Sequence, residues 1–134
     1  MGIFIMQWRD HLPDDCPPDD ALPAHGLVYR LANKANFDSK DFLSRREEKP
    51  DGEWDVTECI AGGVSIYTEL NGIKRLQEIS PAMRRKKIIK GTLESKHGKM
   101  KNTPSTTHPS HFTWWIPIDS QPWKVFQLVN LSDT

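Results

Sequence analysis

The amino-acid sequence predicts a single α+β domain: a mostly antiparallel sheet of about five strands, two or three short helices and an extended N-terminal arm. Three observations predict this fold class. A chain of 134 residues, 37% of them hydrophobic, is long enough to bury one core. Five short segments have the apolar and aromatic composition of strands. Apolar residues recur at helical spacing over residues 70–79.

Residues 1–24 form the expected arm, and residues 25–134 form the expected domain. Four prolines lie among aspartates in the arm. Because proline fixes the backbone and removes a hydrogen-bond donor, neither a strand nor a helix is expected there. The apolar side chains of the arm, which include residues 3–5, Trp8 and Leu12, must pack either along the domain or onto a partner.

Strands are predicted where apolar and aromatic residues lie between turn residues, over residues 26–31, 62–68, 87–93, 111–116 and 123–129. In the second of these strands, Val64 and Ile66 point to one face of the sheet. Ser65 and Tyr67 point to the other face.

Helices are predicted in three places. Ser39 caps a helix over residues 40–47, and Thr68 caps a helix over residues 70–79. Ser80, followed by proline, opens another short helix.

A polar loop of 17 residues, from 94 to 110, precedes the fourth strand. So long a loop either serves a function or stays mobile. Trp114 and Trp115 follow in that strand and point to opposite faces, so one of them packs in the core. The other must cover a ligand, the arm or a partner protein.

The charges are unevenly distributed, although eighteen acidic and eighteen basic residues cancel. Residues 9–20 hold five aspartates and one arginine, whereas residues 74–101 hold ten basic and two acidic residues. Residues 84–101 therefore form either a solvated face or a surface for phosphates, with RNA as one partner. No apolar stretch approaches the ~20 residues that span a bilayer, so no membrane partner is expected.

Cys16 and Cys59 lie 43 residues apart, and their surroundings do not resemble a secreted disulfide scaffold. We therefore expect two reduced thiols in a cytoplasmic protein. His108 and His111 are spaced as HxxH, but two histidines are too few for a structural zinc site, so no metal is expected.

Two strands carry further candidate site residues. Arg30 lies within the first strand, where a half-buried guanidinium needs either a ligand phosphate or an internal carboxylate such as that of Asp41. His111 begins the fourth strand. Its imidazole can donate or accept a proton near neutral pH, so it either lines a pocket or is satisfied in a local turn.

Residues 63–76 form a glycine-led strand that carries a hydroxyl and an aromatic residue into a helix. This segment resembles the central motif of the ADP-ribosyltransferase superfamily. The resemblance implies a small NAD- or nucleotide-binding domain that acts on protein or RNA. It also implies that Arg30, Ser65 and Thr68 hold the NAD, and that Tyr67 stacks on its nicotinamide.

The resemblance makes Tyr67 and His111 the candidate catalytic residues. The superfamily has a late glutamate that stabilises the oxocarbenium-like sugar, but this chain contains no glutamate after Glu94. Gln127 on the last strand, or His111, would have to take its place.

The whole chain also resembles a group of small uncharacterised bacterial proteins through Cys16-Pro-Pro-Asp-Asp-Ala21, Gly63-Val-Ser-Ile-Tyr67 and His111-Phe-Thr-Trp-Trp115. This resemblance implies no activity. It leaves a second class of function open, a non-enzymatic accessory or inhibitory subunit of a bacterial toxin, defence or mobile-element system. An exposed tryptophan, the acidic arm and the basic segment would then bind the partner protein.

Overall fold

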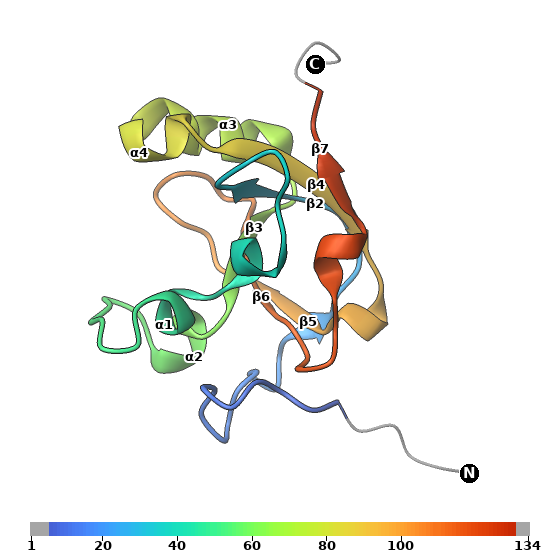
Figure 1. The fold of residues 1–134 in the computed structure, drawn as a ribbon. Helices are drawn as coiled ribbons and strands as arrows, with labels where there is room; N and C mark the ends of the chain where they lie inside the picture. Colours follow the sequence, from blue (N-terminus) through green and yellow to red (C-terminus); the bar gives the residue numbers. More distant parts are fainter. Residues whose placement is uncertain (1–5, 131–134) are drawn as a thin grey trace.

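The computed structural model describes residues 6–130, which form one sheet of seven strands with every neighbouring pair antiparallel (Figure 1). The order across the sheet is β1-β5-β6-β3-β2-β4-β7. The α+β class is therefore confirmed, with two strands more than expected. The strands are β1 (Leu22–Pro23), β2 (Gly26–Ala32), β3 (Val64–Tyr67), β4 (Lys87–Leu93), β5 (Lys99–Asn102), β6 (His111–Trp115) and β7 (Phe126–Leu128).

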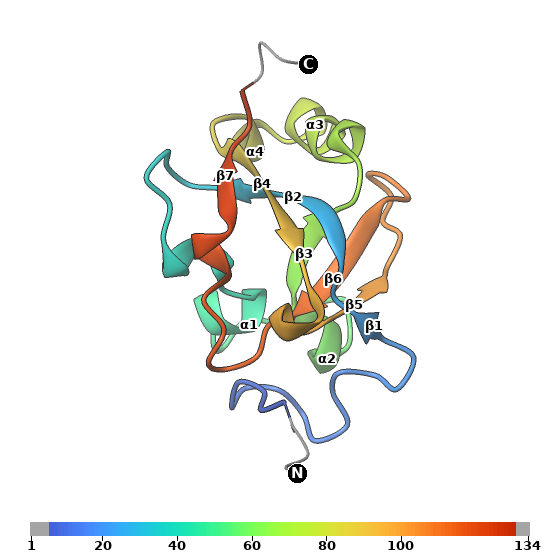
Figure 2. The same cartoon turned by 90° about the vertical axis from the view of Figure 1, so that its right-hand side faces the viewer.

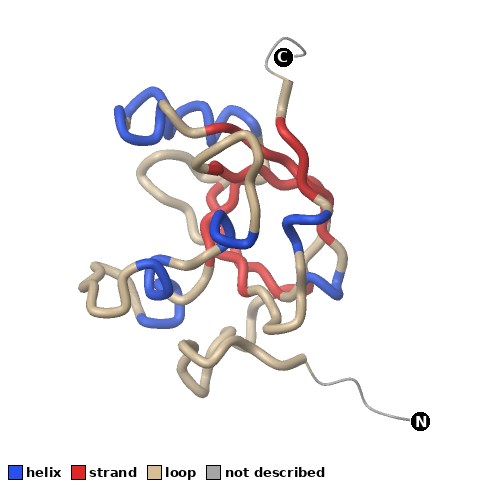
Figure 3. The backbone as a smooth tube through the Cα atoms, in the orientation of Figure 1, coloured by secondary structure: helices blue, strands red, loops and turns tan. Residues whose placement is uncertain are grey.

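Short helices lie around the sheet, and loops connect most of the elements (Figure 3). Two views at right angles agree that α3 and α4 lie at one end of the sheet, with α1 and α2 nearer the other (Figures 1 and 2). The helices are α1 (Arg45–Glu48), α2 (Glu58–Ala61), α3 (Leu70–Ile79) and α4 (Pro81–Arg84). Single 3₁₀ turns cover Ser39–Phe42, Ser95–His97 and Pro122–Lys124.

The main core packs against one face of the sheet. Val64 and Ile66 of β3 lie in it, as their alternation predicts. Trp114 is fully buried there and stacks on Phe126, with ring centroids 6.0 Å apart, and the edge of Phe42 meets both rings. On the other face, a smaller cluster forms around Tyr67 and residues of α3.

Several predicted elements are confirmed. β2, β4 and β6 match the expected strands to within one residue, and α3 and α4 begin where the sequence predicts. Residues 94–110 are expected to be one long loop, but they contain a 3₁₀ turn and β5. β5 pairs with both β1 and β6, so the segment without regular structure is shorter than expected. Met100 is the apolar residue of β5 that is buried in the core.

The prediction of one helix over residues 40–47 is wrong, because two capping residues divide the segment into a 3₁₀ turn and α1. Asp38, rather than Ser39, caps the first 3₁₀ turn. The Ser44 hydroxyl accepts a hydrogen bond from the Glu47 amide, and the Glu47 carboxylate accepts one from the Ser44 amide, so α1 starts anew. Thr68 does not cap α3 either, since Glu69 occupies the capping position without a side-chain bond.

The arm packs along the domain from residue 6 onwards; residues 3–5 lie outside the described residues. The Ile118 amide donates to the Gln7 carbonyl at 2.9 Å, and Trp8 pairs with Pro117. Further along the arm, β1 adds to the edge of β5.

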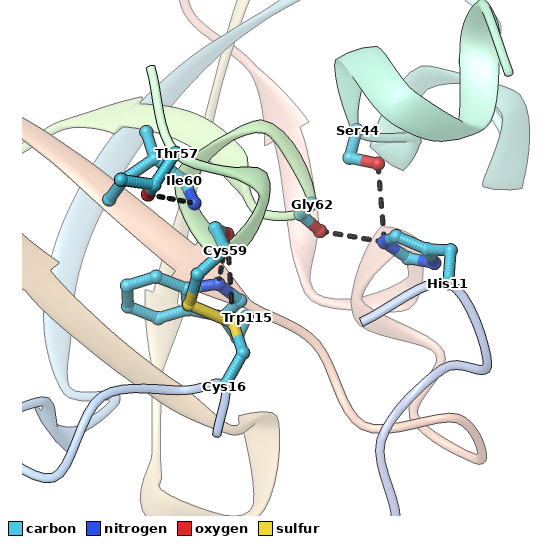
Figure 4. Close-up of a disulfide and its surroundings, with 8 residues drawn as sticks. All are labelled: His11, Cys16, Ser44, Thr57, Cys59, Ile60, Gly62 and Trp115. Carbon is cyan, nitrogen blue, oxygen red and sulfur yellow. Dashed lines mark hydrogen bonds between the residues drawn. A yellow bond between two sulfur atoms is a disulfide. The ribbon is translucent and has the colours of Figure 1, made fainter. Parts of the chain in front are cut away.

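A disulfide joins Cys16 of the arm to Cys59 of α2, so the expectation of two reduced thiols is wrong (Figure 4). Trp115 lies beside it, fully buried, and its indole N–H donates to the Cys59 carbonyl at 2.8 Å. Of the three surfaces that Trp115 was expected to cover, it covers the arm. Neither Trp114 nor Trp115 is therefore available to a partner protein.

Within residues 6–130, no helix has the length and apolar character needed to cross a bilayer.

Candidate functional site

Ser65, Tyr67 and His111 come together on the face of the sheet opposite the main core. β3 and β6 are antiparallel partners, with Tyr67 opposite His111 and Ser65 opposite Thr113. Side chains two residues apart share a face, so both Ser65 and Tyr67 lie near His111. The rings of Tyr67 and His111 meet edge to face, with centroids 5.3 Å apart.

Two adjoining cavities, of about 380 and 530 Å³, lie on this side of the sheet. Ser65, Tyr67 and Arg45 line both cavities. The larger cavity is bordered by α2, α3 and the loop between β5 and β6, which contributes a row of hydroxyl side chains. Volumes of this order are typical of small-molecule sites, and the hydroxyl groups suit a polar ligand.

A chain of hydrogen bonds holds His111 against Ser65. The Ser65 hydroxyl oxygen is 3.0 Å from Nε2 of His111, and Nδ1 of His111 is 2.7 Å from the carbonyl oxygen of Thr103. A carbonyl oxygen can only accept, so Nδ1 carries the proton and Nε2 keeps its lone pair. Nε2 therefore accepts a hydrogen bond from the Ser65 hydroxyl.

His111 is neutral at physiological pH in this arrangement. Burial lowers the pKa of its imidazole below the ordinary 6.5, and the positive charge of Arg45 lowers it further. The bond to the Thr103 carbonyl acts in the opposite direction. A neutral imidazole with a free lone pair can accept a proton from a hydroxyl group, which is the property of a general base.

The β5–β6 hairpin fixes the position of Thr103. The Thr103 amide donates to the His111 carbonyl at 3.0 Å, and the Asn102 side chain donates to the same carbonyl at 3.0 Å. The Thr103 hydroxyl lies 2.8 Å from that of Thr113, which is buried. The two ring nitrogens of His111 are thus held by Ser65 of β3 and by Thr103, which directly follows β5.

Close packing of α3 completes this wall of the site. Gly72 faces Tyr67 and the β5–β6 loop, and a Cβ atom there would lie 2.6 Å from Cδ1 of Tyr67 and closer still to the Ser110 hydroxyl. Glycine therefore allows α3 to approach β3 closely.

Arg30 points to the backbone. Its Nε donates to the Asp41 carbonyl at 2.9 Å, and its two terminal nitrogens donate to the carbonyls of Ser65 and Leu43 at 2.6 and 3.3 Å. Burial lowers the pKa of Arg30 to about 10, so it still carries its charge at neutral pH. The internal partner of Arg30 is thus a set of three carbonyl oxygens rather than the Asp41 carboxylate. That carboxylate accepts from two backbone amides instead.

Two other candidates lie apart from Ser65 and His111. Thr68 follows β3, where its amide donates to the Ser110 carbonyl at 3.1 Å, and it lines neither of the two cavities. Gln127 is exposed on β7, which three strands separate from β6. Of the two proposed substitutes for the late glutamate, His111 is therefore the one beside Ser65.

Arg45, like Thr103, is a site residue that sequence reasoning missed. It lies exposed on α1, its guanidinium is 5.8 Å from the centre of the Trp54 ring, and it lines both cavities. Within residues 6–130 this guanidinium makes no hydrogen bond or ion pair, whereas neighbouring Arg46 pairs with Glu58 at 2.6 Å. Its position in a run of charged residues carried no signal that distinguished it from Arg46.

The two histidines of the HxxH spacing have separate partners. Nδ1 of His108 lies 2.8 Å from the Ser110 hydroxyl, whereas His111 contacts Ser65 and Thr103. Among the described residues, no group of three or more metal-ligating side chains is close enough to hold an ion.

The basic segment over residues 84–101 is divided across the molecule. It runs from the end of α4 through β4 to β5, and three other strands separate β4 from β5. Lys101 pairs with Asp20 of the arm at 2.8 Å, and Arg84 donates to two carbonyls at the end of α3. Part of this charge is therefore used within the domain.

No protein-family model matches the chain, and no curated protein or solved structure shows significant similarity to it. The fold and the site define an α+β domain with a hydroxyl-rich cleft beside its sheet. The resemblance of residues 63–76 to the ADP-ribosyltransferase superfamily and that of the chain to a group of small bacterial proteins both remain predictions.

Proposed function

We propose that the domain binds NAD or a related nucleotide in the two adjoining cavities and acts as an ADP-ribosyltransferase-like enzyme on protein or RNA. The observation that carries this proposal is the convergence of Ser65, Tyr67 and His111, from two strands, on one cavity of about 530 Å³. The resemblance of residues 63–76 to the superfamily's central motif supplies the class of ligand.

In this proposal His111 stands in the place of the missing glutamate and acts as a general base. The bond between nicotinamide and the ribose C1′ breaks, and the electron pair leaves with nicotinamide. The hydroxyl group of the acceptor forms a bond to C1′, and its proton passes to Nε2 of His111. Two features support this role: the neutral imidazole that burial favours, and the carbonyl of Thr103 that fixes its orientation.

Arg45 supplies the phosphate contact that the sequence assigned to Arg30. All nitrogens of the Arg30 guanidinium already donate to carbonyl oxygens, whereas the Arg45 guanidinium makes no such bond within the described chain. Lys49 and Lys86 line the same cavity as Arg45, against the single carboxylate of Glu48. This excess of positive charge favours an anionic ligand.

Tyr67 has a supporting role here. It is only 4% exposed, and its ring already contacts the edge of His111, so little of the ring is open to stack on nicotinamide. Burial raises the pKa of its phenol, which therefore stays protonated.

Isothermal titration and thermal unfolding with NAD, ADP-ribose and ATP test the proposal. A ligand at 100 times its dissociation constant should stabilise the fold by about 2.7 kcal/mol. We expect Arg45→Gln to weaken binding of ADP-ribose and ATP, and His111→Gln to abolish nicotinamide release from NAD while NAD still binds. Arg75→Gln is the matched control, because Arg75 is an exposed arginine of α3 whose partner is Glu78.

The absence of any thermal shift with these nucleotides would contradict the proposal. It would favour the second class of function, an accessory or inhibitory subunit that binds a partner protein. If Arg45→Gln binds the nucleotides as tightly as the native protein, the nucleotide site is supported but Arg45 does not contribute to it.

A further inference from the structure

We propose that Ser65 is an activated nucleophile, with His111 as its general base, and that the domain can cleave carboxylic esters through an acyl-serine intermediate. This activity goes beyond nucleotide binding and does not depend on it. The geometry that points to it is the Ser65–His111–Thr103 hydrogen-bond chain at the wall of an open cavity.

Serine is a weak nucleophile until a base removes its proton. Here the base lies 3.0 Å from the hydroxyl oxygen, within the distance needed for proton transfer. The Thr103 carbonyl, 2.7 Å from Nδ1, holds the ring in the tautomer that leaves Nε2 free. The arrangement therefore contains a nucleophile, a base and a group that orients the base, which are the three parts of a serine catalytic triad.

Two other serine hydroxyls lie within hydrogen-bond distance of a histidine ring among the described residues, but neither is as well placed. The Ser44 hydroxyl is 3.4 Å from His11, is 1% exposed and already accepts the capping bond of α1. Ser110 is 5% exposed and lines neither of the two cavities. Ser65 is half-buried and lines both cavities, so a substrate in either cavity can reach its hydroxyl.

The larger cavity suits a neutral ester with a short acyl group. Val56, Ile60 and Leu76 supply apolar surface for the acyl chain. Arg45 lines the same cavity and lowers the pKa of His111 through its charge, so a cation lies near the reacting atoms. That cation can stabilise the negative oxygen that forms when the carbonyl is attacked.

Water is the second reactant in this ester hydrolysis. The Ser65 oxygen bonds to the carbonyl carbon, and its proton moves to Nε2 of His111. The alcohol leaves and takes that proton, which gives an acyl-serine. Water then attacks the acyl-serine while His111 accepts its proton; the carboxylic acid leaves, and Ser65 regains its hydrogen.

A fluorophosphonate probe tests the nucleophile directly on the full chain, because the serine oxygen displaces fluoride and keeps the phosphonyl group. We expect one probe per molecule, located at Ser65 by peptide mass spectrometry. His111→Gln should label at least about 100-fold more slowly, the usual loss when a general base is removed. Hydrolysis of p-nitrophenyl acetate should fall in parallel.

Ser95→Ala is the matched control, since Ser95 is exposed and lines neither of the two cavities. It should label like the native protein. The labelling rate of the native protein should fall with a midpoint below pH 6.5 as His111 is protonated.

Three results would each overturn the proposal: no labelling of the native protein, labelling at another residue, or labelling of His111→Gln at the native rate when its unfolding midpoint is unchanged. His111→Asn covers the case in which His111→Gln fails to fold, because its side-chain amide also has no nitrogen that can accept a proton. Loss of nucleotide binding alone would contradict the proposed function and leave this inference intact.

Discussion

Replacing Arg30 with alanine removes the guanidinium that links β2 to its surroundings. Its three donors bind the carbonyls of Asp41 and Leu43, on either side of Phe42, and of Ser65 in β3. This side chain therefore adds three hydrogen bonds between β2, β3 and the segment that leads into α1, beside the packing of Phe42 in the core. A role in ligand binding predicts a stable variant that no longer binds nucleotide, whereas the structural role predicts a loss of stability.

The size of that loss follows from the contacts. A hydrogen bond from a charged donor contributes roughly 1.5–3 kcal/mol, so three such bonds set an upper range of about 4.5–9 kcal/mol. The contact to Leu43 is long, at 3.3 Å, and the side chain is only half-buried, so water can replace part of what is lost. We therefore expect Arg30→Ala to lower the free energy of unfolding by about 3–4 kcal/mol.

Urea unfolding followed by tryptophan fluorescence measures this change, with Arg30→Lys as the control. Lysine keeps the charge but cannot donate in three fixed directions, so it should recover only part of the loss. If Arg30→Ala lowers the free energy of unfolding by less than about 1 kcal/mol and no longer binds nucleotide, the structural role is refuted and Arg30 binds the ligand instead.

Three further outcomes are expected. Cys59→Ser should lower the free energy of unfolding by about 4 kcal/mol, because the disulfide closes a loop with a sequence separation of 43; dithiothreitol should produce the same loss in the native protein and none in the variant. Burial lowers the pKa of both His111 and His97, so the folded protein binds fewer protons than the unfolded chain just below pH 6.5. Stability should therefore be constant above that pH and fall on acidification, with a smaller fall in His111→Gln, as urea midpoints at pH 7.5 and 5.5 will measure. Replacing a glycine within a helix by alanine normally stabilises the helix. In Gly72→Ala, however, the new methyl group would collide with β3 and the β5–β6 loop, so calorimetry should give a lower melting temperature.

The sequence predicts the elements whose patterns are local. The alternation in β3 places Val64 in the core and Ser65 in the cleft, and the spacing of apolar residues predicts the bounds of α3. β1 and β5 escape prediction because one has two residues and the other has a single buried apolar side chain among lysines and an asparagine. Their stability comes from pairing with strands distant in sequence, which no local pattern records.

The candidate site shows the same limit. Ser65, Tyr67 and His111 are recognisable as polar residues on adjacent strands, but the contact between Ser65 and His111 depends on the pairing of β3 with β6. The partners of Arg30 are backbone carbonyls, which a sequence presents at every position. The disulfide depends on where the arm runs, and proline-rich chain gives little indication of its path.

The edges of the sheet have a consequence for how the molecule behaves at high concentration. β5 would be an open edge of four residues without the arm, and β1 covers it with two residues, one of which is a proline that has no amide hydrogen to offer. At the opposite edge, β7 is three residues long. Both borders thus leave few backbone groups for a neighbouring molecule to pair with, so the short strands and the arm protect the sheet against growth into aggregates.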